Sequence, residues 1–408
     1  MEEPWGSPRF VEERFREWYQ THSRLVHPPR RPAEREYAFI HFGSRGMVRH
    51  LSLPTAGELQ AYLRNHTPKH AYYSSSYYRD PTADMRLKGW LGADLVFDID
   101  ADHFDLPCQK IHDRWACRNC GAQGVGHPPE LCTCGKAQFE RETWLCDKCL
   151  QAAKYETEKL LDLLITDLGA ELGELTVNFS GNRGFHVHVQ GDRWGRLDQH
   201  ARREIVDYVM GTGIEAQYMG FTPRGGGYAK PPEVGWRRRV GRALYDYLGS
   251  VGEEELRALK VSRRSREAIL GRREELLDAI LAGETSRVLS YLDSRSIDLL
   301  LSRAVKLLAA EVDTVVTTDV HRLIRLANTL HGKTGWLVQN VPIDQLPQYD
   351  PLTSAIAFKG GPVKLRFRWA PKIKIMDTWY GPYEDEEATL PLEAALFFLC
   401  KNGAKVVD

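Results

Sequence analysis

The chain has 408 residues, of which 42% are hydrophobic and 10% aromatic, enough for a catalytic domain with a sizeable core and at least one smaller unit. It contains no apolar run long enough to cross a bilayer, and residues 1–16 are charged rather than signal-like, so we expect a cytoplasmic protein without a membrane partner. The 55 basic and 55 acidic side chains balance, which argues mildly against a uniformly basic nucleic-acid binder but not against an enzyme with a local basic groove.

The first hundred residues predict strands, turns and one helix. YAFIHF and MVRHLSL flank the turn GSRG, which indicates a strand, a turn and a strand within residues 36–53. A short helix is expected over residues 56–65, followed by a Tyr- and Ser-rich segment at 72–79 and by the strand DLVFDID at 94–100. This order favours a mixed α/β fold for this part of the chain.

Two aspartates share one face of the last of these strands. Alternate side chains of a strand point the same way, so Asp98 and Asp100 lie together, about 7 Å apart along the strand. Two such carboxylates can bracket a pair of Mg²⁺ or Mn²⁺ ions of the kind that assists phosphoryl transfer. The alternative, a solvated strand face that ends in a turn, is at least as common for a lone DxD pattern. Asp102 continues the alternation only if the strand continues.

Seven of the eight cysteines lie between Cys108 and Cys149, a clustering that indicates metal binding rather than disulfides. Their CxxC and CxC spacings are typical of structural zinc, and with either His112 or His127 they exceed the needs of one ion. Two zinc sites would use the sets Cys108, His112, Cys146 and Cys149, and Cys117, Cys120, Cys132 and Cys134.

A second strand–turn–strand follows a helix predicted over residues 150–168. LTVNFS, SGNRG and FHVHV place Gly181 and Gly184 in the turn, where a backbone without Cβ atoms can approach a phosphate and form an anion nest. Arg183 adds a guanidinium fork suited to phosphate oxygens. His186 and His188 fall on the face opposite the apolar residues. The alternative is a tight hairpin with incidental histidines.

Residues 197–308 predict a run of helices, interrupted by a loop at TPRGGGYAKPPEVG, residues 222–235. Asp313 then precedes a predicted helix, TTDVHRLIRLANTL, which Thr318 or Asp319 would cap and Gly332 would end. Arg322 and Arg325 would share its face, with His331 and Lys333 at its exit. A third metal carboxylate followed by triphosphate-binding residues is one interpretation. The other is a surface helix whose basic residues oppose its dipole.

The ordered set of motifs resembles the small catalytic subunit of DNA primases of the archaeal and eukaryotic type, and looks closest to archaeal members. The likeness covers most of residues 36–335 and rests on YAFIHF with MVRH, HAYYSSSYYRDP, KGWLGADLVFDIDADH, SGNRGFHVHV and VTTDVHRLIRLANTLHGKTG. The resemblance implies that Asp98, Asp100 and Asp313 hold the catalytic metals. It also implies that the triphosphate of the incoming nucleotide is bound by Ser180, Arg183, His186, Arg325, His331 and Lys333.

The resemblance further implies a mixed-sheet, RRM-like primase catalytic domain at residues 1–200 and 309–408. Within it lies a zinc-binding insertion at 105–150, and a helical subdomain spans 201–308. The expected function is two-metal nucleotidyl transfer from NTPs, with dNTPs as an open second substrate. It would make short primers de novo on single-stranded DNA, with a primase large subunit as partner. A primase-like repair or bypass polymerase is the alternative enzyme, and a non-catalytic zinc-based scaffold is the alternative from another class.

Overall fold

The computed structural model describes residues 4–221 and 235–407 of the chain. The chain divides into two compact units, which we call the sheet unit (residues 1–158, 173–203 and 312–408) and the helical unit (159–172 and 204–311). Apart from its last glycine, the loop predicted at 222–235 lies outside the described residues. Within the described ranges, no helix is both long and apolar enough to cross a membrane.

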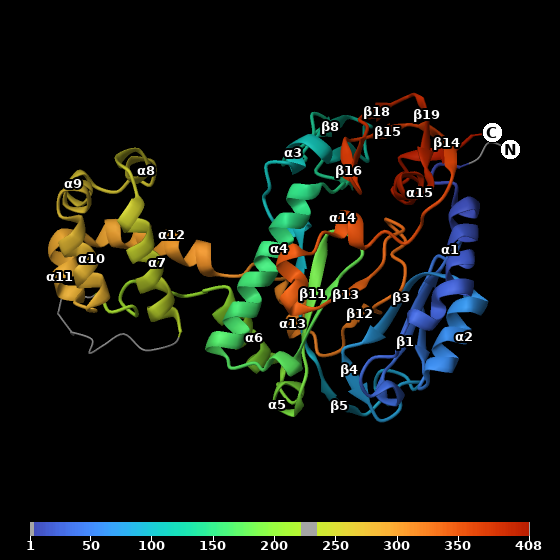
Figure 1. The fold of residues 1–408 in the computed structure, drawn as a ribbon, viewed down its shortest axis with the longest axis horizontal. Helices are drawn as coiled ribbons and strands as arrows, with labels where there is room; N and C mark the ends of the chain where they lie inside the picture. Colours follow the sequence, from blue (N-terminus) through green and yellow to red (C-terminus); the bar gives the residue numbers. More distant parts are fainter. Residues whose placement is uncertain (1–3, 222–234, 408) are drawn as a thin grey trace. The chain divides into compact units, whose positions relative to one another are not determined.

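The paired aspartates lie in a four-stranded antiparallel sheet with the order β13-β10-β11-β6 (Figure 1). In its register, Asp98 faces His186 and Asp100 faces Gly184 across the β6–β11 ladder. A Cβ atom on Gly184 would overlap the carbonyl oxygen of Ile99, so the strands can approach this closely only at a glycine. The strands are β6 (Leu95–Asp100), β10 (Leu175–Phe179), β11 (Gly184–Val189) and β13 (Gln339–Val341).

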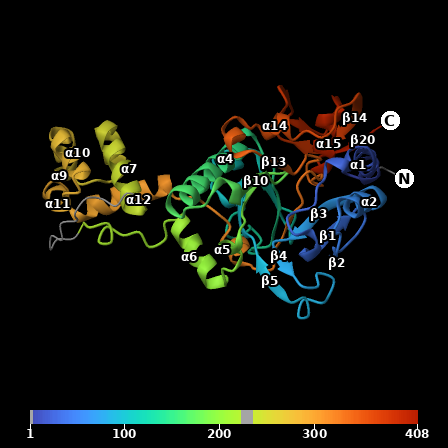
Figure 2. The ribbon, with the colours of Figure 1, turned by 60° about the horizontal axis from the view of Figure 1, so that its bottom comes forward.

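A second antiparallel sheet has the order β12-β3-β1-β2. Its strands are β1 (Tyr37–His41), β2 (Val48–Leu51), β3 (Pro68–Ser74) and β12 (Leu323–Arg325), so the two strands predicted within residues 36–53 are confirmed. Helices α1 (Pro8–His22) and α2 (Ala56–His66) lie beside it in both ribbon views (Figures 1 and 2). The rings of Phe39 on β1 and Tyr62 on α2 stack with centroids 4.3 Å apart and so join helix to sheet.

The helix predicted over residues 317–330 is wrong. Helix α13 spans only Thr314–Thr318, and the chain then forms β12, which pairs with β3. Ile324 explains the difference, because it is β-branched and is buried in a cluster with Val96 and Val316, while the edge of β3 supplies its backbone partners. Tertiary pairing thus overrides a helical pattern of apolar residues. Without that helix, Arg322 and Arg325 do not share a helix face, and Gly332 does not end a helix.

A third sheet, β19-β14-β20, packs on the apolar helix α15 (Leu392–Cys400), whose residues from Ala394 to Leu399 are buried. The start of the chain is attached here. The Gly6 N–H donates to the Ala404 carbonyl at 2.8 Å, and the Val406 N–H donates to the Ser7 hydroxyl at 2.9 Å. The strands are β14 (Pro362–Phe367), β19 (Glu387–Pro391) and β20 (Ala404–Val406).

Shorter elements complete the sheet unit. A three-stranded ribbon with the order β8-β7-β9 carries half of the cysteines. The ribbon strands are β7 (Arg114–Cys117), β8 (Gln123–Val125) and β9 (Phe139–Glu142). The strand pairs are β4 (Ser76–Tyr78) with β5 (Trp90–Ala93), β15 (Trp369–Ala370) with β18 (Tyr383–Glu384), and β16 (Ile373–Ile375) with β17 (Thr378–Tyr380). The remaining helices of this part are α3 (Gln109–His112), α4 (Asp147–Asp162), α5 (Asp192–Gly195) and α14 (Pro351–Ser354).

For the described residues within 197–308, the predicted helical character is confirmed. Successive turns of α7 bury Trp236, Val240, Leu244 and Leu248, the spacing of one helix face. The Asp293 carboxylate caps α12 by accepting from the Ser296 N–H at 2.9 Å. The helices are α6 (Gln199–Val209), α7 (Trp236–Ser250), α8 (Glu253–Ala258), α9 (Arg263–Gly271), α10 (Arg273–Leu281), α11 (Thr285–Tyr291) and α12 (Ser294–Leu308).

Candidate active site and metal centres

Three aspartates converge at the end of β6. The Asp313 N–H donates to the Asp98 carbonyl at 2.8 Å, which holds the start of α13 against this strand. The Asp313 Oδ1 atom accepts from the N–H groups of Val315 and Val316 at 2.8 and 3.3 Å. Asp313 is therefore the N-cap of α13, and its carboxylate is fixed beside the two aspartates of β6 by the helix that it starts.

The electrostatics of this site favour a cation. Burial, and then the nearby Asp100 and Asp313 carboxylates, raise the pKa of Asp98 to about 7. Carboxylates that repel one another are stabilised by a divalent ion, and their oxygen atoms suit Mg²⁺ or Mn²⁺. Within the described parts of the chain, the oxygens of the three aspartates do not all come within 4.8 Å of one another, unlike the ligand atoms of the two cysteine groups below.

The turn between β10 and β11 packs on the loop that follows β12. The Ser180 Oγ accepts from the N–H groups of Asn182 and Gly184 at 3.4 and 3.3 Å, which closes the turn on itself. Gly181 has a φ of +80°, and a Cβ atom there would lie 2.7 Å from the Cβ of His331. A glycine is therefore required both by the backbone conformation and by the close approach of the two loops.

Arg183 presents an unused donor inside this site. Its side chain is 8% exposed, its Nε lies 3.4 Å from Asp100 Oδ1, and its Nη2 donates to Asp102. Its Nη1 is buried without a hydrogen-bond partner. Since buried donors are nearly always satisfied, this nitrogen points to an anionic ligand. Asp102 lies in a single 3₁₀ turn rather than on an extended β6, and its role as the Arg183 partner was not evident from the sequence.

The two histidines of β11 are both buried, so neither lies on an open polar face. His186 Nε2 lies 3.4 Å from Asp98 Oδ1, and burial followed by the charge of Arg325 lowers its pKa to about 3. The ring is therefore neutral beside the acidic site. His188 is 1% exposed, with its Nδ1 3.5 Å from the Tyr73 hydroxyl, in agreement with a packing role.

Lys333 and His331 lie on the other side of the turn, the lysine exposed and the histidine buried. Burial, and then Arg183 and Arg325, lower the pKa of Lys333, and burial lowers the pKa of His331 well below its usual value. The Lys333 N–H donates to His331 Nδ1 at 3.2 Å. Lys333, Arg183 and Arg325 together make this side of the turn positive, which suits a polyphosphate.

His70 is a part of the site that the sequence did not reveal. Its Nδ1 lies 2.9 Å from Arg325 Nη1 and accepts from the Gly332 N–H at 3.3 Å. The Arg325 guanidinium also lies over the Tyr72 ring, 4.9 Å from its centroid. The available signal was the alternation of β3, which places His70 and Tyr72 on one face.

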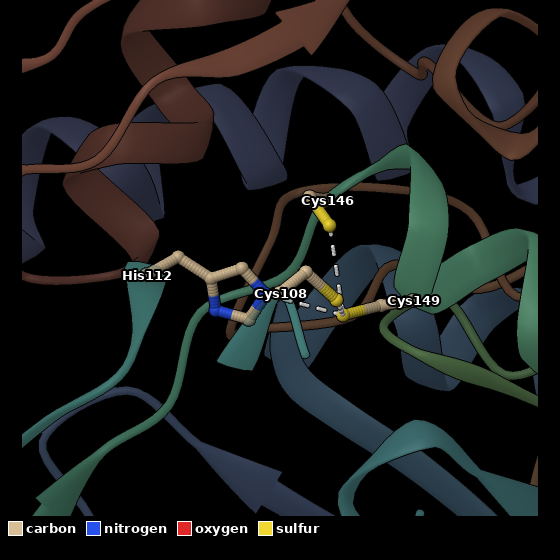
Figure 3. A group of neighbouring side chains, drawn as sticks. All are labelled: Cys108, His112, Cys146 and Cys149. Carbon is tan, nitrogen blue, oxygen red and sulfur yellow. Dashed lines mark hydrogen bonds between the residues drawn. The ribbon is translucent and has the colours of Figure 1, made fainter. Parts of the chain in front are cut away.

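The first cysteine group has the geometry of a zinc site (Figure 3). The Cys149 Sγ lies 3.6 Å from Cys108 Sγ, 3.7 Å from Cys146 Sγ and 3.2 Å from His112 Nε2. Sulfur atoms around a tetrahedral zinc, at about 2.3 Å from the ion, are about 3.8 Å apart, so the group fits. The His112 Nδ1 lies 2.8 Å from an Asp113 oxygen, which orients Nε2 toward the sulfurs.

The second group joins Cys117, Cys120, Cys132 and Cys134 on the three-stranded ribbon, again with all ligand atoms within 4.8 Å. Its sulfurs are paired at 3.7 Å (Cys117 with Cys134) and 3.5 Å (Cys120 with Cys132), so it also fits a tetrahedral ion. Gly121 and Gly135 both have φ near +75°, at 75° and 76°, and form the turns that fold the chain back at each pair.

Comparison with known proteins shows the family of the chain. The family model described as DNA primase small subunit matches residues 130–344. The DNA primase small subunit PriS of Cenarchaeum symbiosum is 32% identical over 396 residues, which cover 96% of each chain. The corresponding subunit of Methanoregula boonei is 32% identical over 424 residues, covering 98% of this chain and 99% of the relative. That of Natronomonas pharaonis is 34% identical over 368 residues, covering 85% and 84%.

The similarity extends over the sheet unit and the helical unit alike, since these alignments cover nearly the whole chain. It agrees with the resemblance found from the ordered motifs. The chain belongs to the family of DNA primase small subunits and is of the archaeal type.

Proposed function

We propose that this chain is a primase catalytic subunit that makes short primers de novo on single-stranded DNA by two-metal nucleotidyl transfer from NTPs. The observation that carries the proposal is that a site for a cation and a site for an anion lie close together. The pKa of Asp98 is raised to about 7, which favours a bound cation, and the buried Nη1 of Arg183 has no hydrogen-bond partner, which favours a bound anion. A nucleoside triphosphate with its divalent ions would fill both sites at once.

In this proposal Asp98, Asp100 and Asp313 hold Mg²⁺ or Mn²⁺, which supplies positive charge to the α-phosphate and to the pyrophosphate leaving group. Six side chains would orient the triphosphate in line for attack. The cations Arg183, Arg325 and Lys333 would do so by charge, and Ser180 and the neutral rings of His186 and His331 by hydrogen bonds. A primase must hold two nucleotides together without a primer. Holding reactants in the right geometry can lower an activation barrier by about 7 kcal/mol or more in favourable cases.

Three further parts of the proposal rest on family membership and on the cysteine geometry. The two cysteine groups would each hold a structural Zn²⁺, since four protein ligands leave no open position for catalysis. The sheet unit would be the RRM-like catalytic domain, with the zinc-binding insertion at residues 105–150 and the helical subdomain at 201–308. The partners would be a primase large subunit, the DNA template and nucleotides.

The test is primer synthesis on unprimed single-stranded DNA with labelled NTPs and Mg²⁺ or Mn²⁺. Asp98→Asn keeps the size of the side chain but removes the charge, and the exposed Asp377→Asn is the matched control. We expect products from the wild type and the control and none from Asp98→Asn. Extension of an annealed primer without de novo products would favour the repair or bypass polymerase, and no synthesis by folded, zinc-loaded protein would contradict an enzymatic role for the isolated chain.

A further inference from the structure

One lysine near the proposed triphosphate site comes from the far end of the chain. Lys401 is the first residue after α15, and its N–H donates to the Phe397 carbonyl at 3.0 Å. Because α15 is buried among aromatic side chains and the sheet β19-β14-β20, the position of the Lys401 backbone is fixed. Its side chain therefore starts from a fixed point of the folded core and not from a flexible surface segment.

The ammonium group of Lys401 has only neutral partners. Its Nζ lies 3.4 Å from the side-chain oxygen of Asn182, in the turn of the site, and 3.4 Å from the carbonyl of Thr143. Its Nζ also lies 6.0 Å from the centroid of the Phe397 ring, and within residues 4–221 and 235–407 it forms no ion pair with a carboxylate. A half-buried lysine that is held by two long bonds to neutral oxygens has its charge uncompensated.

Neighbouring positive charges make the charged form of Lys401 still less favourable. Burial, and then Arg183 and Lys333, lower the pKa of Lys401 to about 7, while Asp102 and Asp100 act weakly in the opposite direction. Lys401 in turn contributes to the lowered pKa of His331. Like charges that converge from three separate segments are unfavourable unless an anion joins them.

We propose that Lys401 is a further phosphate-binding residue, which contacts the terminal phosphates of the nucleoside triphosphate from the side of Asn182. This inference rests on the function proposed above. The β6–β11 register gives the placement. Asp98 faces His186, Asp100 faces Gly184, and the turn with Asn182 continues beyond them. Lys401 thus adjoins the part of the site most distant from Asp98, where the phosphates beyond the α-phosphate would lie.

The experiment measures equilibrium binding of ATP, AMP and inorganic tripolyphosphate by titration calorimetry in the presence of Mg²⁺, using the full chain. The variants are Lys401→Gln, which removes the charge, Lys401→Arg, which keeps it, and the exposed Lys359→Gln as control. For Lys401→Gln we expect affinity for ATP and tripolyphosphate to fall about tenfold, the order expected for one charge-assisted contact, with affinity for AMP unchanged. Lys401→Arg should stay within about threefold of wild type, and Lys359→Gln should match it.

Two results would overturn the inference by different routes. Equal losses for ATP and AMP, or a loss for ATP below twofold, would sink the role of Lys401 while leaving the triphosphate site intact. Wild-type protein that binds ATP no more tightly than AMP would remove the triphosphate site itself, and with it both proposals. Thermal unfolding of each variant excludes a trivial cause, because loss of an uncompensated charge should leave the melting temperature unchanged or higher.

Discussion

The Nη1 atom of Arg325 lies 2.9 Å from the Nδ1 atom of His70. Burial, and then the charges of Arg325 and of the neighbouring lysines, lower the pKa of His70 to about 2, so the ring stays neutral and its Nδ1 can accept this hydrogen bond. A residue of β3 thus orients a cation of the proposed nucleotide site. His70 acts through Arg325, and we describe it as a positioning residue.

We expect His70→Ala to lower kcat/KM for primer synthesis about tenfold, because a buried guanidinium loses its acceptor. His70→Asn should recover most of the loss, since the Asn side-chain oxygen can occupy the place of Nδ1. Steady-state kinetics of both variants check this. If the asparagine variant is as impaired as the alanine variant while both remain folded, the acceptor is not what His70 contributes.

Asp313 has two separable roles, as helix cap and as proposed metal ligand. Asp313→Asn keeps an oxygen that can accept from the Val315 and Val316 N–H groups, so stability should change little. Synthesis should nevertheless fall about a hundredfold or more, since charge at a metal site is worth several kcal/mol. Asp313→Ala should show the same loss of activity and an added loss of about 1 kcal/mol in the free energy of unfolding. Denaturant titrations beside primer assays distinguish the two roles, and an active Asp313→Asn would contradict the ligand role.

The raised pKa of Asp98 has a consequence for stability. Its folded-state pKa of about 7 lies above the ordinary value of 3.8, so the folded protein holds this proton more tightly than the unfolded chain. The stabilisation from this group is complete at low pH and is lost as the pH rises through about 7. Without added Mg²⁺ or Mn²⁺, Asp98→Asn should therefore have a higher free energy of unfolding than the wild type, by about 4 kcal/mol at pH 8 and by less at pH 6. Melting curves at the two pH values, with Asp377→Asn as reference, test this. A stability gain that does not grow with pH would count against it.

Metal analysis should find two zinc ions per chain. Cys149→Ser should lose one ion and lower the melting temperature of the sheet unit, since Cys149 is 1% exposed and Asp113, which orients His112, also accepts from the Trp144 N–H. Cys132→Ser should also lose one ion but leave primer synthesis close to wild type, because its ligand group belongs to the ribbon β8-β7-β9 and not to the sheet that carries Asp98 and Asp100. Cys400→Ser is the control and should keep both ions. Wild-type protein with a single zinc would show that one group is not a metal site.

Local patterns predicted the parts of the site that one segment builds alone. The alternation in β6, the glycines of the turn at 180–184 and the cysteine spacings each depend on neighbours in sequence. The segment after Thr318 has the apolar pattern of a helix but forms β12, because three strand residues are too few to show a strand period.

Contacts between distant segments were not predictable from such patterns. The bond from Arg325 to His70 requires β12 to pair with β3, and the approach of Lys401 to Asn182 requires α15 to pack across the C-terminal sheet. Neither lysine nor histidine carries a local signature that separates a site residue from a surface one. Only the tertiary structure brings their charges together.

The hydrogen bonds that join residues 6 and 7 to β20 give the molecule a mechanical weak point. Tension applied between the two ends of the described chain would act first on the bonds from Gly6 to Ala404 and from Val406 to Ser7. Their rupture would peel β20 from β14 and release the segment that carries Lys401, while the ladders of β6, β10 and β11 stay unloaded. When the two ends are pulled apart, the protein should therefore lose affinity for nucleotide before the strands that carry the aspartates separate.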